Sequence, residues 1–150
     1  MTKKSTKTGV LTPTDAISIY EVSAPVNNPH QGQARKVVFC CSVGLLRSPT
    51  AAEMATQLGM NARCAGWRPQ ALQQLSANLI EWANQLVFLD AECAWQAQRL
   101  FSGLAQEAAL WRKSVGWNIP DDFDFRDPQL CAQIRPLLAK LAELPIHMPS

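Results

Sequence analysis

Two residues with complementary chemistry lie close together in the first third of the chain. Cys41 and Arg47 are separated by five residues in the stretch "CSVGLLRS". A thiolate is a strong nucleophile, and the planar guanidinium group grips two phosphate oxygens at once. Ser48 directly follows the arginine, and its hydroxyl is able to hydrogen-bond a departing sulfur. These residue types favour phosphoryl transfer through a cysteinyl-phosphate intermediate.

The segments on either side of this loop indicate how it is positioned. The apolar run "KVVFC" at 36–40 is typical of a central parallel strand. Ser48 and Pro49 suit the N-cap and first position of a helix that ends at Gly59. A loop that curls into a helix start points N–H groups inward, and this builds an anion cradle that also favours the thiolate of Cys41. Gly44 supplies a residue that tolerates positive φ. The residues expected to bind phosphate are Ser42, Val43, Gly44, Leu45, Leu46 and Arg47.

In the rest of the chain, segments with the residue pattern of a β-strand alternate with segments that have the pattern of an α-helix. Further strands are predicted at 62–65, 86–89 and 114–119, and further helices at 75–85, 91–102 and 128–144. The alternation predicts an α/β domain on a small parallel sheet. Pro136 is expected to kink the last helix or to begin a new one. Three tryptophans with helical spacing are expected in the core: Trp82, Trp95 and Trp111.

The domain boundary is predicted near residue 34. Residues 1–34 are polar and contain the linker-like stretch "APVNNPHQGQA", although Ala16 to Val22 have the composition of a short strand. Residues 35–150 are expected to form one domain, which is long enough to bury a core without disulfides or metals.

Charge and cysteine content exclude several classes of protein. The net charge is +2 and the basic residues are dispersed, which does not favour nucleic acid or a membrane as partner. No apolar run has the length of a membrane span or follows the pattern of a secretory signal. The five cysteines are an odd number without metal-site spacing, so we expect reduced thiols, a cytosolic protein, and no metal or cofactor.

A second candidate for chemistry is the late polar loop "PDDFDFRD". A carboxyl group that protonates a leaving oxygen must lie near the phosphate but outside the cradle, and a polar loop after a strand permits this. Asp121, Asp122 and Asp124 are all candidates from their type and position alone. A solvated acidic turn is the other interpretation of the loop.

Four stretches, in order, resemble the low-molecular-weight protein tyrosine phosphatases, and in particular a bacterial and phage branch of that family. They are "VVFCCSVGLLRSPTAAEM", "ARCAGW", "LIEWANQLVFLD" and "NIPDDFDFRDPQL", within residues 36–144. The resemblance implies a four-stranded parallel sheet flanked by helices on both faces. It also implies the following roles: Cys41 as nucleophile, Arg47 as phosphate clamp, Ser48 as the hydroxyl that supports the sulfur, Asp121 as general acid with Asp122 in reserve, and Phe123 as the aromatic residue of the acid loop.

The chain also departs from the family pattern. Gly44 stands where the family usually has a loop-bracing asparagine, and Leu46 stands where many members have a cysteine that protects the nucleophile as a disulfide. Cys40 is expected to point away from Cys41 into the core, which leaves Cys64 as the candidate protecting thiol. Trp67 either walls the substrate pocket, as the resemblance implies, or is an exposed loop residue.

The leading hypothesis is a metal-independent phosphomonoesterase acting on a phosphorylated protein or aryl phosphate, with inorganic phosphate or sulfate as a ligand of the site. One alternative is a thiol-dependent arsenate reductase on the same fold. That activity needs two further cysteines near the third strand, where only Cys93 is present, and Cys131 lies far downstream. The other alternative is a phosphate-binding module without turnover, which would have no need of Cys41.

Overall fold

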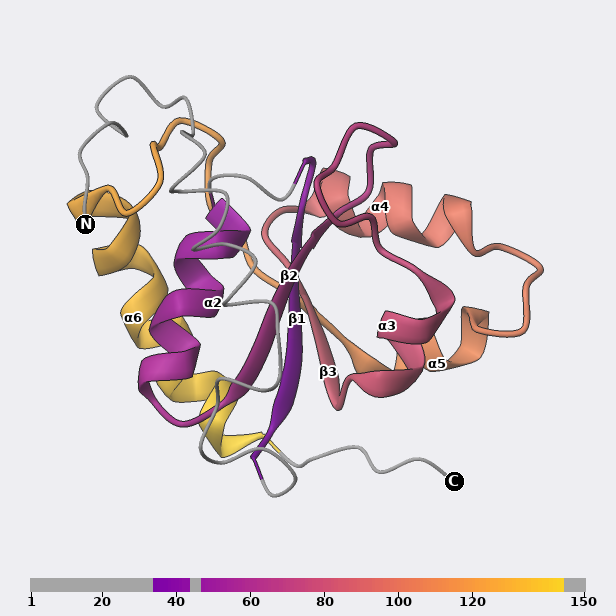
Figure 1. Cartoon of the computed structure of the whole chain (residues 1–150), viewed down its shortest axis with the longest axis horizontal. Helices are drawn as coiled ribbons and strands as arrows, with labels where there is room; N and C mark the ends of the chain where they lie inside the picture. The colour runs from indigo at the N-terminus through magenta and orange to yellow at the C-terminus, as the bar shows by residue number, and fades with distance from the viewer. Residues whose placement is uncertain (1–33, 44–46, 145–150) are drawn as a thin grey trace.

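The structure is a computed structural model that describes residues 34–43 and 47–144. Its centre is a four-stranded parallel sheet in the order β2-β1-β3-β4 (Figure 1). The strands are β1 (Lys36–Cys41), β2 (Asn61–Gly66), β3 (Gln85–Phe88) and β4 (Ser114–Gly116). The predicted α/β fold is confirmed. The strand expected at Ala16 to Val22 and the loop residues Gly44, Leu45 and Leu46 lie outside the described residues.

Helices cover both faces of the sheet. They are α2 (Arg47–Gln57), α3 (Ala77–Trp82), α4 (Ala91–Leu100), α5 (Glu107–Lys113) and α6 (Pro128–Glu143). In Figure 1, α2 and α6 lie on one side of the strands, and α3, α4 and α5 lie on the other. The sequence indicated a helical pattern around Trp111, but no bounds were predicted for α5. α6 continues through Pro136 as one helix, so the expectation of a new helix there is wrong.

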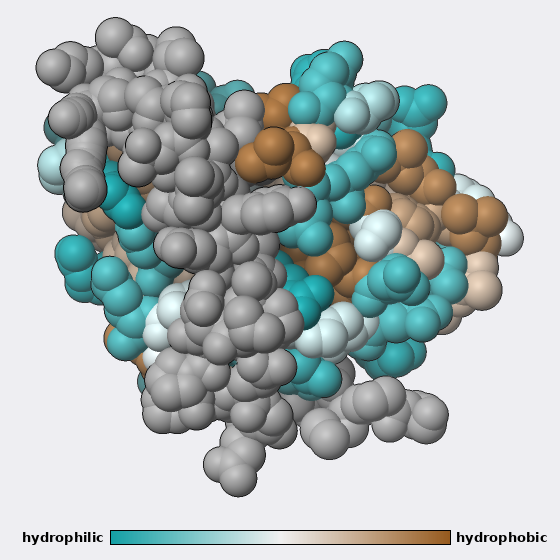
Figure 2. Space-filling model, in the orientation of Figure 1, coloured by the Kyte–Doolittle hydropathy of each residue, from teal (hydrophilic) through white to brown (hydrophobic). Residues whose placement is uncertain are grey.

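Two of the three tryptophans expected in the core are at the surface. Trp95 is 53% exposed and Trp111 is 57% exposed, whereas Trp82 is half-buried against the guanidinium of Arg63. The cause is the narrow buried face of the short helices. α4 buries Cys93 and Ala97, which are four positions apart, and Trp95 lies between them on the outer side. Figure 2 also shows hydrophobic surface at the edge formed by α4 and the segment that leads to α5, where leucine side chains are exposed.

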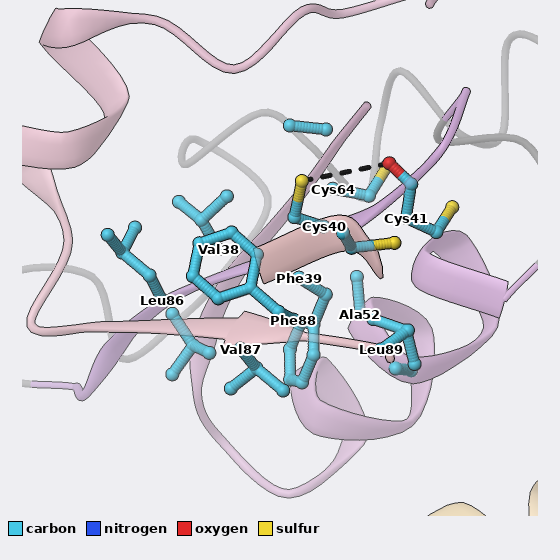
Figure 3. Close-up of a cluster of buried hydrophobic side chains, with 14 of the residues drawn as sticks. Val38, Phe39, Cys40, Cys41, Ala52, Cys64, Leu86, Val87, Phe88 and Leu89 are labelled. Atoms are coloured by element: carbon cyan, nitrogen blue, oxygen red, sulfur yellow. Dashed lines mark hydrogen bonds between the residues drawn. The ribbon is translucent and has the colours of Figure 1, made fainter. Parts of the chain in front are cut away.

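The core is built around β1, because this strand has a neighbour on each side and helices on both faces. Every residue of β1 after Lys36 is buried. Cys40 is 1% exposed, and Figure 3 shows its side chain turned away from that of Cys41, as strand alternation predicted. Burial raises the pKa of the Cys40 thiol well above its ordinary value. Cys40 is therefore a neutral core residue.

The parallel arrangement brings the carboxyl ends of all four strands to one edge of the sheet. Cys41 ends β1 there, and α2 begins with Arg47 after a short connection. Asp90 follows β3 and caps α4 by accepting a hydrogen bond of 2.8 Å from the backbone N–H of Cys93. Ligands of open α/β sheets bind at this edge, so the fold places the predicted cradle where a site is expected.

The end of β2 lies against the segment that follows Cys41. The backbone N–H groups of Trp67 and Arg68 donate to the carbonyls of Cys41 and Ser42, over 3.2 and 2.9 Å. Gly66 permits this approach, because a Cβ atom there would lie 2.6 Å from the carbonyl carbon of Val43. The glycine thus lets β2 brace the start of the cradle.

Replacing Gly66 with alanine is expected to destabilise the protein by about 1–3 kcal/mol, because the new methyl group meets rigid backbone. Gly116→Ala is the matched control, since a Cβ atom at that position has no neighbour within 4 Å. Urea denaturation of both variants measures the difference. Equal stability of the two variants would contradict the close-packing argument.

Candidate active site

Cys41 and Ser48 meet at the junction between β1 and α2. The Sγ atom of Cys41 lies 3.0 Å from the Oγ atom of Ser48. Both residues are buried, Cys41 as the last residue of β1 and Ser48 in the first turn of α2. A hydroxyl at this distance can donate a hydrogen bond to a thiolate. The structure therefore brings together the two residues predicted as nucleophile and supporting hydroxyl.

Arg47 is the most deeply buried charged group of the site. Its side chain is 2% exposed, and its Nη1 atom donates to the Oδ2 atom of Asp90 and to the carbonyl of Ile119, both over 2.7 Å. Its Nε atom lies 3.3 Å from the Oδ1 atom of Asp121. The guanidinium group is thus held from three directions next to Cys41.

The charges around Arg47 keep it protonated. Burial lowers its pKa, but the hydrogen bond to Asp90 and the charges of Cys41, Asp121 and Asp90 outweigh burial and raise the pKa above its ordinary value. A fixed, permanently charged guanidinium group is suited to binding an anion whose charge is shared among several oxygens.

Asp90 is a member of the site that sequence reasoning missed. Burial raises its pKa, but hydrogen bonds from Arg47 and from the backbone and thiol of Cys93 lower it more, so the pKa lies below the ordinary value of 3.8. Its carboxylate therefore does two things, capping α4 and orienting Arg47. The available signal was an aspartate directly after the buried run "QLVFL", at the edge where ligands bind.

The three candidate aspartates of the late loop differ in position. Asp121 lies next to Arg47 although its own side chain is 62% exposed. Asp122 and Asp124 are also exposed, and no contact with Arg47 is seen for either. Phe123 is half-buried and packs against the core. The structure thus brings the predicted general acid, and not its reserve, to Arg47.

Of the other residues predicted to bind substrate, Ser42 and Val43 follow β1 directly and Trp67 follows β2 directly. Ser42 and Val43 are half-buried at the start of the loop, under the end of β2. Trp67 is half-buried and packs against the core, and the guanidinium of Arg68 lies 4.5 Å above its ring. Trp67 is therefore not the freely exposed loop residue that was the alternative expectation.

The described residues combine a thiol, a hydroxyl, a buried guanidinium group and a partly exposed carboxyl group around the beginning of α2. That helix has eleven residues, and its N-terminus adds a partial positive charge. This arrangement can bind an oxyanion, attack it with sulfur and transfer a proton. Within residues 34–43 and 47–144, no group of three or more His, Cys, Asp or Glu side chains is placed to hold a metal ion. None of the helices in that part of the chain is long and apolar enough to cross a membrane.

Asp90→Asn is expected to destabilise the protein by about 1–3 kcal/mol at neutral pH, because it leaves the buried Arg47 with a weaker partner. Because the folded-state pKa of Asp90 is lowered, its contribution is complete above about pH 4 and is lost as the pH falls through the folded-state value. The difference from wild type should therefore shrink in acid.

Urea denaturation at several pH values measures this difference. Asp122→Asn, at an exposed position of the same loop, is the control and should match wild type. A deficit of Asp90→Asn that stays constant down to the lowest pH would refute the role of its charge.

Comparison with known proteins shows a likeness in structure only. No family model matches the chain, and no curated protein matches it. The tyrosine phosphatase Wzb from Escherichia coli K30, solved in complex with phosphate, is 16% identical with a TM-score of 0.58, and the match covers 74% of this chain and 98% of that one. The low-molecular-weight protein tyrosine phosphatase from Campylobacter jejuni is 16% identical with a TM-score of 0.55, covering 76% and 99%.

The YwlE arginine phosphatase from Geobacillus stearothermophilus is also similar, at 16% identity and a TM-score of 0.52, with 72% of this chain and 93% of that one covered. The chain shares with all three a four-stranded parallel sheet flanked by helices. The resemblance found in the sequence is therefore confirmed at the level of structure: this chain has the fold of the low-molecular-weight protein tyrosine phosphatases.

Proposed function

We propose that the protein is a phosphomonoester hydrolase that acts through a cysteinyl-phosphate intermediate on Cys41. The observation that carries the proposal is the contact of 3.0 Å between Cys41 Sγ and Ser48 Oγ beside the buried guanidinium of Arg47. A nucleophile, its supporting hydroxyl and an anion clamp within one junction are what phosphoryl transfer requires. The structural neighbours support the proposal, since they are phosphatases and one of them contains phosphate.

In the first step the thiolate of Cys41 attacks phosphorus. The S–P bond forms while the bond between phosphorus and the ester oxygen breaks, and the leaving oxygen takes a proton from Asp121. Arg47 balances the charge on the transferring group, and Asp90 keeps the guanidinium group in place. The distance of 3.3 Å between Arg47 and Asp121 supports this assignment, because a proton donor must lie at the edge of the anion site.

In the second step water attacks the phosphorus atom of the cysteinyl phosphate. The carboxylate of Asp121 now accepts a proton from that water, and the S–P bond breaks to release inorganic phosphate. The hydroxyl of Ser48, at 3.0 Å, stabilises the thiolate of Cys41 as it leaves. One aspartate therefore serves as acid and then as base.

The proposed substrate is an aryl phosphate, with phosphotyrosine in a protein as the biological form. Trp67 and Phe123 are both half-buried and are the aromatic residues proposed to wall the pocket. The proposal places the protein in the cytosol, where the thiols of its five cysteines would stay reduced.

The two rival functions receive less support. Cys93, the nearest candidate for the second thiol of an arsenate reductase, is 1% exposed, and burial together with its hydrogen bond to Asp90 raises its pKa. Such a thiol is a poor attacking group. Cys131 lines a groove between α2 and α6 with Glu53 and Leu58. A binding module without turnover would have no need of a thiol beside Ser48 in the site.

Hydrolysis of para-nitrophenyl phosphate without added metal tests the proposal. Wild type is expected to turn over at mildly acidic pH, and Cys41→Ser should fall to background because a serine hydroxyl is a much weaker nucleophile and a much poorer leaving group than a thiolate. Asp121→Ala should lower kcat/KM by about 10²-fold, the usual contribution of a general acid. Asp122→Ala is the matched control, because its side chain is exposed on the same loop, and it should retain wild-type activity.

Three outcomes would change the proposal. A folded wild type that binds phosphate but releases none from the ester would leave the cradle without the assigned reaction. A loss with Asp122→Ala as large as that with Asp121→Ala would remove Asp121 as the sole proton donor. Reduction of arsenate coupled to thioredoxin would favour the reductase instead.

A further inference from the structure

The acid loop, defined here as residues 119–127, is attached to the protein at both ends. At its entry, the backbone N–H of Ile119 donates to the carbonyl of Leu89 over 2.9 Å, and the carbonyl of Ile119 accepts from Arg47 over 2.7 Å. Asp121 follows two residues later. The entry of the loop is therefore fixed to the catalytic arginine itself.

At its exit the acid loop is bound to α2 through Arg126. The backbone N–H of Arg126 donates to Thr50 Oγ1 over 2.9 Å. Its guanidinium group forms a two-pronged ion pair with Glu53, from Nε to Oε1 over 2.9 Å and from Nη2 to Oε2 over 2.6 Å. Thr50 and Glu53 lie three positions apart, so they share one face of α2.

The backbone of Arg126 is in an unfavourable conformation. Its φ angle is +64°, and it is the one non-glycine residue with positive φ among those that the structure describes. A residue without glycine's freedom persists in this region only when its surroundings hold it there. Here those surroundings are Thr50, Glu53 and the ring of Phe125, which lies 4.7 Å from the guanidinium carbon.

The ion pair contributes little that the fold itself requires. Arg126 is 48% exposed and Glu53 is 24% exposed, so even a two-pronged ion pair adds only a modest amount to stability. The helix that follows is already capped by Asp127, whose Oδ1 atom accepts from the backbone N–H of Gln129 over 2.8 Å. It is also anchored by buried residues such as Leu130 and Ile134. A strained, fork-bound arginine at this place therefore points to a role in the site.

We propose that Glu53 and Arg126 are positioning residues that hold the acid loop so that Asp121 meets the leaving oxygen, an inference that rests on the proposed phosphatase function. α2 carries Arg47 and Ser48 in its first turn and Glu53 further along the same helix. Arg126 ties the loop of the general acid to this helix. The position of the proton donor relative to the anion clamp therefore varies less than it would if the loop were free.

A comparison of leaving groups isolates this role. The departing phenolate of 2,4-dinitrophenyl phosphate is a weak base and needs no proton, whereas that of phenyl phosphate is a strong base and needs one. Glu53→Gln and Arg126→Gly are each expected to lower kcat/KM for phenyl phosphate by about 10-fold, and for the dinitrophenyl ester by less than about 2-fold. A purely structural loss would lower both equally.

Three further measurements accompany the activity assays of the two variants. Arg126→Gly removes the fork and also relieves the positive φ, so its melting temperature should not fall with its activity. Glu81→Gln removes a surface carboxylate on α3 that bonds Gln106, and it should behave as wild type. The double variant of Glu53 and Arg126 should lose no more than the worse single variant, because the two residues form one contact.

The result that would overturn the inference is distinct from the failure of the proposed function. Equal losses with both esters, no loss with either, or losses that multiply in the double variant would overturn the positioning role while the phosphatase function stands. A folded wild type that hydrolyses neither ester would overturn the function, and the inference with it.

Discussion

The rest of the site depends on one buried positive charge. The side chain of Arg47 is 2% exposed. A charged guanidinium group that is shielded from water in this way needs hydrogen-bond and charge partners in the folded protein. Its partners come from the residue that caps α4, from the backbone after β4 and from the acid loop. The groups that pair with this one side chain therefore connect the carboxyl ends of β1, β3 and β4. An anion that enters the site meets a cation whose orientation is already set.

The sequence predicted those parts of the site that are local. A strand, a loop and a helix start follow one another directly between Lys36 and Gln57, so the closeness of Cys41 to Ser48 follows from the order of the chain. The opposite direction of Cys40 follows from strand alternation alone. Asp121 is different, because three similar aspartates share its loop, and only the resemblance to a family separated it from them.

The contacts that escaped prediction join residues far apart in the chain. Asp90 lies 43 positions from Arg47. Helix capping already accounts for an aspartate at this position, so nothing in the sequence indicated that Asp90 also pairs with Arg47. Arg126 lies 73 positions from Glu53, and an arginine, unlike a glycine, does not predict a positive φ angle. The exposure of Trp95 and Trp111 shows the same limit in the core. Helical spacing is local, but which face a short helix buries is decided by its neighbours.

The central position of β1 has a consequence for how the protein is made. β1 comes first in the chain among the strands that the structure describes, yet its partner β3 and the groups that pair with Arg47 are synthesised much later. A nascent chain that has released α2 from the ribosome therefore has an arginine whose native environment does not yet exist. Sheets closed by such long-range contacts form slowly, since loop closure precedes the gain from pairing. We expect Cys41, the proposed nucleophile, to spend this interval in a loosely ordered segment and to reach its final surroundings only when the C-terminal third of the chain has emerged.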